Sequence, residues 1–154
     1  MKVYFAADHA GFELKNELIN LVRGEMNLDV EDCGALSYDA ADDYPAIIAA
    51  AARKLSTDVA AGKDSRAIVI GGSGTGEAIV ANRFAHVRAA VYYGDSLDIV
   101  KLSRAHNDAN ALSLAARFVS KDEAKEAVRV WLSTAFSHDE RHERRISQID
   151  SLHE

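Results

Sequence analysis

The glycine-rich segment Gly71–Glu77 combines residue types and spacing that suit acid–base chemistry on an anionic ligand. Ala67–Ile70, just before it, is a short apolar run rich in β-branched residues, which is typical of a strand buried on both faces. The residues after Glu77 are compatible with a helix. Backbone amides in a loop between a strand and a helix converge on an anion, and glycine leaves room for its approach. The segment therefore predicts a carboxylate beside an oxyanion cradle formed by the amides of Gly72, Gly74 and Gly76.

Two common phosphate-binding loops fit this segment poorly. It lacks the Gly-Lys-Ser/Thr ending of a nucleoside triphosphate loop. In a dinucleotide fingerprint counted from Gly72, Glu77 would replace the third glycine and place a carboxylate near a pyrophosphate. A second interpretation of Glu77 stays open here, because the dipole of a helix also favours a surface carboxylate at the helix start.

Strands and helices are expected to alternate along the chain. Apolar runs predict five strands, at Val3–Ala7, Leu28–Asp32, Ala67–Ile70, Val87–Tyr93 and Ala111–Leu114. Helices are predicted over Gly11–Arg23, from Asp43, after Glu77, over Ser96–Arg104 and from Ser120, and the mostly charged last segment begins at Asp139. This pattern predicts a single α/β domain with a parallel sheet covered by helices on both faces.

The topology suggests where the chemistry takes place. In such sheets ligands bind beyond the carboxyl ends of the strands, where the strand order reverses. Asp8 and His9 follow the first strand, and Gly71–Glu77 follows the third. We also expect His106 and Asn107 at this rim, near the later strands. These side chains and the loop amides would together form an acid–base site.

Composition excludes several functional classes. A chain of 154 residues with 48% hydrophobic and 27% charged residues is an ordinary globular protein, and its net charge of −6 argues against a general nucleic-acid binder. Cys33 is the only cysteine, so the chain has no internal disulfide and no cysteine metal cluster. No apolar run reaches membrane-spanning length, and the first strand begins without a signal peptide's apolar region. We therefore expect a cytoplasmic protein without a membrane partner.

Five motifs follow one another over nearly the whole chain: Asp8–Gly11, Asp43–Pro45, Gly72–Gly76 with Ala81-Asn82, Ser103–Asp108, and Arg141 with Arg145. In this order they resemble the ribose-5-phosphate isomerase B family, which also holds allose- and galactose-6-phosphate isomerases. The resemblance implies a Rossmann-like α/β/α sandwich with a five-stranded parallel sheet, in a dimer or a pair of dimers. It also implies interconversion of aldose and ketose phosphates, a step of the pentose phosphate pathway, without a metal or an organic cofactor.

The resemblance places active sites between subunits. The C-terminal helical segment, about residues 137–154, would then pack on a partner, and its arginines and the His106 region would serve the partner's glycine loop. Many family members carry a catalytic Cys where this chain has Ser73. A second branch uses a Glu at the far end of the loop, which matches Glu77. Cys33 lies at the end of the second predicted strand, and we interpret it as a packed free thiol.

Aldose–ketose isomerisation needs a base, a means of holding the enediolate charge, and a group that opens the sugar ring. Glu77 is the candidate base, and His106 is the ring-opening candidate because histidine exchanges protons near neutrality. Ser73 and Thr75 either relay protons between substrate oxygens or simply satisfy their own turn. The remaining candidates bind substrate: Asp8 and Asn107 through oxygens of the sugar or the enediolate, and His9, Arg117, Arg141 and Arg145 through the phosphate.

Weaker interpretations remain beside these. Without the family, residues 141–145 would be a solvated helix face. His142 has a smaller claim to the site, and packing explains Tyr44. The leading hypothesis is a ribose 5-phosphate/ribulose 5-phosphate isomerase acting through a cis-enediol or enediolate. The alternatives are an isomerase of allose 6-phosphate or a tetrose phosphate, a non-catalytic sugar-phosphate binder, and, less favoured, a dinucleotide-binding module.

Overall fold

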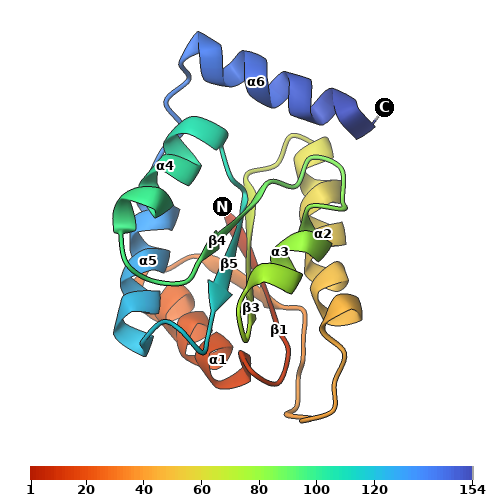
Figure 1. Cartoon of the computed structure of the whole chain (residues 1–154), viewed down its shortest axis with the longest axis vertical. Coiled ribbons are helices and arrows are strands. Elements are labelled where there is room, and N and C mark those ends of the chain that lie inside the picture. Colours follow the sequence, from red (N-terminus) through yellow and green to blue (C-terminus); the bar gives the residue numbers. More distant parts are fainter. Residues whose placement is uncertain (154) are drawn as a thin grey trace.

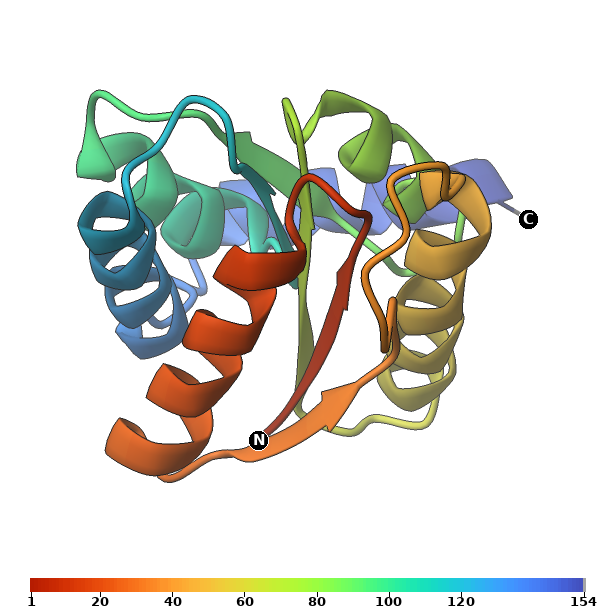
Figure 2. The same cartoon turned by 90° about the horizontal axis from the view of Figure 1, so that it is seen from below.

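The computed structural model describes residues 1–153 and contains one five-stranded sheet with helices on both faces (Figures 1 and 2). The strands are β1 Lys2–Ala7, β2 Asp29–Asp32, β3 Ser65–Gly71, β4 Ala89–Tyr92 and β5 Ala111–Ala115. All neighbouring pairs are parallel, in the order β2-β1-β3-β5-β4.

The helices are α1 Phe12–Asn20, α2 Tyr44–Ala60, α3 Thr75–Ala81, α4 Leu97–Asn107, α5 Lys121–Ser133 and α6 Glu140–Asp150. A π-helical turn, η1 Leu21–Glu25, continues α1, and a 3₁₀ turn, η2 Ser151–His153, follows α6. The predicted five-stranded parallel α/β/α sandwich is confirmed.

Two hydrophobic layers fill the space between the sheet and the helices. Residues of α1, α4 and α5 pack on one face, where Trp131 and Leu18 are fully buried. Residues of α2 and α3 pack on the other face around Ile48 and Leu55. Figure 2 shows the sheet between these two groups of helices. The buried runs of β1 and β3 are apolar on both faces because both faces are covered.

The strand order reverses beside β1. The chain passes from β1 to β2 on one side and then returns to β3 on the other side of β1. Ala7 and Ile70 are partners in register at the carboxyl ends of β1 and β3. The loops that leave these two ends therefore diverge around an open crevice, as expected for a ligand site in this type of fold.

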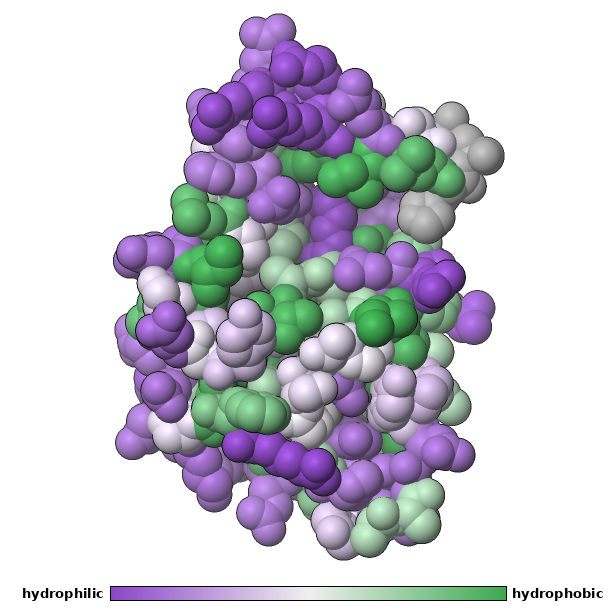
Figure 3. All heavy atoms as spheres, in the orientation of Figure 1, coloured by the Kyte–Doolittle hydropathy of each residue, from purple (hydrophilic) through white to green (hydrophobic). Residues whose placement is uncertain are grey.

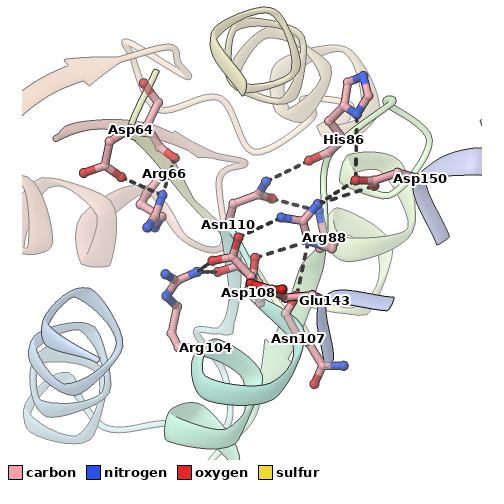
Figure 4. A network of polar contacts seen from close by, with 12 residues as sticks. Asp64, Arg66, His86, Arg88, Arg104, Asn107, Asp108, Asn110, Glu143 and Asp150 are labelled. Carbon is pink, nitrogen blue, oxygen red and sulfur yellow. Dashed lines mark hydrogen bonds and ion pairs between the residues drawn. The ribbon is translucent and has the colours of Figure 1, made fainter. Parts of the chain in front are cut away.

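A polar network lies at the opposite end of the sheet, where the strands begin (Figure 4). Arg88 pairs with Asp108 at 3.1 Å and with Asp150 of α6 at 3.4 Å. Arg104 pairs with the same Asp108 at 2.7 Å and donates to the carbonyl of Ala109. The half-buried Arg88 thus attaches α6, which lies across the amino-terminal ends of the strands in Figure 1, and the buried Arg104 holds the Asp108 with which Arg88 pairs.

The end of α4 corrects one prediction. The helix continues to Asn107, beyond the expected end at Arg104, and stops at Asp108, which adopts the left-handed conformation with φ of 43°. β5 begins only after this turn, so His106 and Asn107 lie at its amino-terminal side. The expectation that both residues lie at the carboxyl rim is wrong, because the polar residues close a helix and do not follow a strand.

Candidate active site

A cavity of about 560 Å³ opens at the crevice beyond β1 and β3. It brings together both predicted loops and residues from the end of β5. The lining residues are Asp8, His9, Ala10, Tyr44, Gly72, Ser73, Gly76, Glu77, Arg117 and Phe118. The cavity thus contains two carboxylates, an imidazole and a guanidinium group within one concave surface.

Glu77 is buried in this cavity wall, with 4% of the residue exposed. Its carboxylate lies against Gly71, where an added Cβ would be only 1.9 Å from Oε1. Burial raises the pKa of Glu77, and the charge of Asp8 acts in the same direction, while a hydrogen bond from its own amide opposes both. The surface position considered for Glu77 is therefore wrong. A buried carboxylate with a raised pKa is a better base than an exposed one.

The loop before α3 is held in a defined conformation by Gly74 and Ser113. Gly74 has φ of 73°, a conformation that favours glycine, and begins α3. Its carbonyl accepts a 2.6 Å hydrogen bond from the buried Ser113 hydroxyl of β5, which fixes the loop to the sheet. The exposed Ser73 accepts a 3.3 Å bond from the amide of Thr75, so Ser73 at least satisfies its own turn. The first amides of a helix have no partner within it. In α3 the amide of Thr75 is taken by Ser73 and the amide of Glu77 bonds its own carboxylate.

Two further glycines allow close packing around the cavity. A Cβ at Gly76 would lie 2.7 Å from the phenol of Tyr44, and a Cβ at Gly72 would lie 3.3 Å from the guanidinium carbon of Arg117. Tyr44 is half-buried against the core, as the sequence suggested, and it also lines the cavity. Arg117 is exposed, and its backbone amide donates to the carbonyl of Gly72 at 3.1 Å.

Asp8 and His9 occupy the turn after β1. Asp8 is buried, and its Oδ1 accepts hydrogen bonds from the amides of Ala10 and Gly11 at 2.9 and 3.2 Å. The His9 ring contacts Asp42 with 2.7 Å between Nδ1 and Oδ1. The ligand atoms of Asp8, His9 and Asp42 lie within 4.8 Å of one another, which is a spacing that a metal site could use. In this structure the Asp42 carboxylate and the Nδ1 atom of His9 contact each other directly.

The remaining candidates lie at the other end of the sheet. The rings of His106 and His142 stack with 4.3 Å between centroids and 12° between planes. Burial lowers the pKa of His142, and the charges of His106 and Arg141 act in the same direction. Arg141 and Arg145 are exposed on α6, and Figure 4 shows the Asn107 amide pointing away from the arginine network. The five-residue β5 alone separates this group from Arg117 by roughly 16 Å.

One subunit therefore holds two separate groups of predicted site residues. Asp8, His9, Ser73, Glu77 and Arg117 meet around the cavity with the glycine loop, whereas His106, Asn107, Arg141 and Arg145 do not reach it. The sequence reasoning missed Asp42 and Ser113, which hold His9 and Gly74. Asp42 lies in a loop without hydrophobic periodicity, so no sequence signal identifies it. Ser113 is a polar residue within an apolar strand, and this interruption is the signal that could have identified it.

Cys33 lies outside this cavity and is free. Burial raises the pKa of its thiol to about 11, so the reactive thiolate form is disfavoured. This environment agrees with the interpretation of Cys33 as a packed thiol. In the part of the chain that the structure describes, no helix combines the length and apolarity needed to span a membrane.

Comparisons with known proteins extend these observations to the whole chain. Residues 3–149 match the family model described as Ribose/Galactose Isomerase. Ribose-5-phosphate isomerase B of Mycolicibacterium paratuberculosis is 42% identical over 95% of this chain and 87% of the relative. The Escherichia coli ribose-5-phosphate isomerase B is 36% identical over 98% of this chain and 95% of its own length.

Solved structures give the same result. Ribose-5-phosphate isomerase B from Mycoplasma genitalium, solved with bound ribulose-5-phosphate, superposes with a TM-score of 0.91 at 32% identity, covering 99% of this chain and 95% of that one. The enzyme of Thermotoga maritima gives a TM-score of 0.83 at 37% identity, with 97% of each chain covered. With its fold, its cavity and its full-length relatives in agreement, this chain belongs to the ribose/galactose isomerase family.

Proposed function

We propose that this protein is an aldose–ketose isomerase that interconverts ribose 5-phosphate and ribulose 5-phosphate. The observation that carries the proposal is the buried Glu77 carboxylate beside the glycine loop, in a cavity that also holds His9 and Arg117. A non-catalytic binder has no use for a buried carboxylate facing an anionic ligand, because the two charges repel each other. The relatives named ribose-5-phosphate isomerase B support the pentose as substrate.

Glu77 is the base in this proposal. Its carboxylate removes the proton from C2 of the open-chain aldose, and the electron pair moves toward O1 to give a cis-enediolate. The loop amides from Gly72 to Gly76 hold the charge that develops on O1. The protonated Glu77 then returns the proton to C1, and a proton moves from O2 to O1 to complete the ketose. Ser73 or Thr75 relays this last proton.

The raised pKa of Glu77 fits this cycle. The side chain must accept the proton as a carboxylate and return it as a carboxylic acid. Both steps are efficient when its pKa lies near the working pH, and a raised pKa brings a glutamate closer to that pH. Asp8 binds a sugar hydroxyl or the ring oxygen. The phosphate lies at the other end of the cavity, against His9 and Arg117. A guanidinium group can bond two phosphate oxygens at once.

We further propose that the active site is completed by a partner subunit in a homodimer. Four candidate residues can act only if they reach a glycine loop: His106 in ring opening, Asn107 in enediolate binding, and Arg141 and Arg145 in phosphate binding. Within one chain the length of the sheet separates them from it. In the proposed dimer the second copy places the amino-terminal ends of its strands against this crevice. This brings its His106, Asn107 and C-terminal arginines to the glycine loop, and a pair of such dimers keeps the same contacts.

The surface around β4 supports this dimer. β4 is an edge strand, and an uncovered edge invites pairing with another chain. A groove of about 350 Å³ runs beside it and includes Val87, Ala89 and Ile149. Figure 3 shows apolar side chains on the face below α6. Large apolar residues of α3, α4 and α6 are 42% to 56% exposed: Ile79, Ile99, Leu102 and Ile149. Residues 137–154 would cover the partner in this arrangement.

The proposal also places the reaction in the cytoplasm, within the pentose phosphate pathway. A free, unpaired Cys33 suits a reducing compartment. A coupled assay across four-, five- and six-carbon aldose phosphates tests the function, and we expect ribose 5-phosphate to have the highest kcat/KM. A preference for a tetrose phosphate or for allose 6-phosphate would replace the pentose assignment. Binding without turnover of any of these sugars would favour the non-catalytic binder.

A further inference from the structure

We propose that Asp42 is a positioning residue that holds His9 as a cationic ligand for the phosphate of the substrate. This inference rests on the proposed function, since it assigns a task to the phosphate end of the same cavity. Asp42 lies in the loop before α2, 33 positions after His9, and the fold brings the two side chains together.

One carboxylate oxygen contacts His9 twice. Oδ1 of Asp42 accepts from the His9 backbone amide at 3.2 Å and lies 2.7 Å from the ring Nδ1. The first contact fixes the backbone of the turn after β1, and the second fixes the rotation of the imidazole. Because a carboxylate can only accept, Nδ1 must carry a proton. Nε2 is then the ring nitrogen that is left to meet a ligand in the cavity.

The protonation state of Nε2 decides whether a phosphate is attracted or repelled. In a neutral imidazole with its proton on Nδ1, Nε2 presents a lone pair to the phosphate oxygens. Only the imidazolium can donate from Nε2 while Nδ1 bonds to Asp42. The hydrogen bond to Asp42 raises the pKa of His9, the charge of Asp8 adds to this effect, and burial and the charge of Arg117 oppose it. Asp42 thus favours the form that can bind an anion.

The other oxygen of Asp42 indicates that its charge is directed to His9. Asp42 has only 10% of its side chain exposed, and its Oδ2 has no hydrogen-bond partner among the described residues. Buried carboxylate oxygens normally have donors. Among the described residues the only other donor to this carboxylate is the neutral backbone amide of His9, so the His9 imidazolium is the main compensation for its negative charge.

Asp42→Asn separates this role from a purely structural link between the two loops. Asparagine keeps the shape and an accepting oxygen for His9 but removes the charge. Asp43→Asn is the matched control, because it removes the same charge from the next residue, which is exposed and makes no side-chain capping bond. NMR titration of the His9 ring in the full-length protein reports the imidazolium directly, and we expect its pKa to fall in Asp42→Asn and to be unchanged in Asp43→Asn.

Binding of sulfate tests the ligand role, because the charge of sulfate is constant over the useful pH range. At a pH above the His9 pKa that the NMR titration gives for Asp42→Asn and below the one it gives for the wild type, we expect the Kd for sulfate to rise at least about tenfold in the variant, which corresponds to the loss of one charge-assisted bond. At about pH 5.5, where an unpaired histidine is also protonated, the variant should approach the wild type. With sugar phosphate as substrate, KM should rise at high pH while kcat changes little.

Unchanged sulfate binding at high pH in Asp42→Asn would overturn the proposal, as would a fall in kcat with an unchanged KM, which would place His9 in the chemistry. A wild-type protein that binds sulfate in this Asp42-dependent manner but turns over no sugar phosphate would leave the role of Asp42 intact and remove the proposed isomerase function.

Discussion

Gly71→Ala tests whether the position of the Glu77 carboxylate matters. A Cβ at residue 71 would lie 1.9 Å from Oε1, 2.1 Å from Cδ and 2.7 Å from Oε2 of Glu77. The carboxylate must therefore move by about 1.5 Å to reach an ordinary van der Waals distance. Residue 71 does not have a positive φ, so the backbone conformation accepts alanine, and the three atoms nearest to the added Cβ all belong to the Glu77 carboxyl group.

A displacement of this size has a predictable cost. Misplacing a catalytic group by about 1 Å lowers the rate about 10²-fold, so we expect kcat to fall by at least this factor. Overpacking of the buried carboxylate should also lower the free energy of unfolding by about 1–3 kcal/mol. Steady-state kinetics measures the first effect, and chemical denaturation shows whether the variant is still folded under the assay conditions.

Gly24→Ala is the control for Gly71→Ala. It adds the same methyl group on a helical turn where nothing lies within 4 Å, so kcat should stay at the wild-type value. A folded Gly71→Ala variant with wild-type kcat would refute the reasoning, because it would show that turnover does not depend on where this carboxylate lies.

Three further predictions concern residues outside the cavity wall. Arg141→Ala and Arg145→Ala should each raise KM about 10- to 150-fold, since a hydrogen bond to a charged group contributes roughly 1.5–3 kcal/mol. Cys33→Ser should leave kcat unchanged, and a thiol-alkylating reagent should not abolish activity. Asp58 has its pKa lowered from 3.8 to about 2 by Lys63 and two hydroxyl donors. Asp58→Asn should therefore lose about 2 kcal/mol of stability at neutral pH, a difference that is present above about pH 4 and disappears as the pH falls toward 2.

Opposite outcomes would be equally informative. Normal KM values in both arginine variants would make α6 only a solvated surface helix. Loss of activity on alkylation of the wild type but not of Cys33→Ser would place the thiol near the site. A difference in unfolding free energy between wild type and Asp58→Asn that persists at about pH 2 would show that packing, and not the charge of Asp58, accounts for the stabilisation.

The elements with strong local signals could be predicted from the sequence. The apolar β3 run, Pro45 in the first turn of α2 and the capping box of Ser120 with Glu123 all occur where expected. Such signals act over a few residues, so the chain order of strands and helices follows from them. The side of the sheet on which each helix packs follows from parallel strand connections.

The arrangement of the site depends on contacts between residues that are far apart in the chain. Local sequence patterns do not predict such contacts. The end of α4 was misplaced because Asp108 closes the helix in a conformation that is unusual for a residue other than glycine. His106 was expected at the carboxyl rim for a different reason: it was grouped with the loops that follow strands, although it precedes β5 and so lies at the amino-terminal end of that strand. Asp42 was overlooked because its pairing with His9 exists only after β1 and α2 pack together.

Exchange of the C2 deuterium of ribose 5-phosphate with solvent is the most direct measure of proton abstraction by Glu77. Glu77→Gln keeps the size and hydrogen bonding of the side chain but removes the basic oxygen. General-base catalysis contributes about 10²- to 10⁴-fold, so we expect the exchange rate to fall by at least about 10²-fold while the variant still binds ligand. Exchange at the wild-type rate in Glu77→Gln would contradict this mechanism and return the role of base to Ser73, Asp8 or His106.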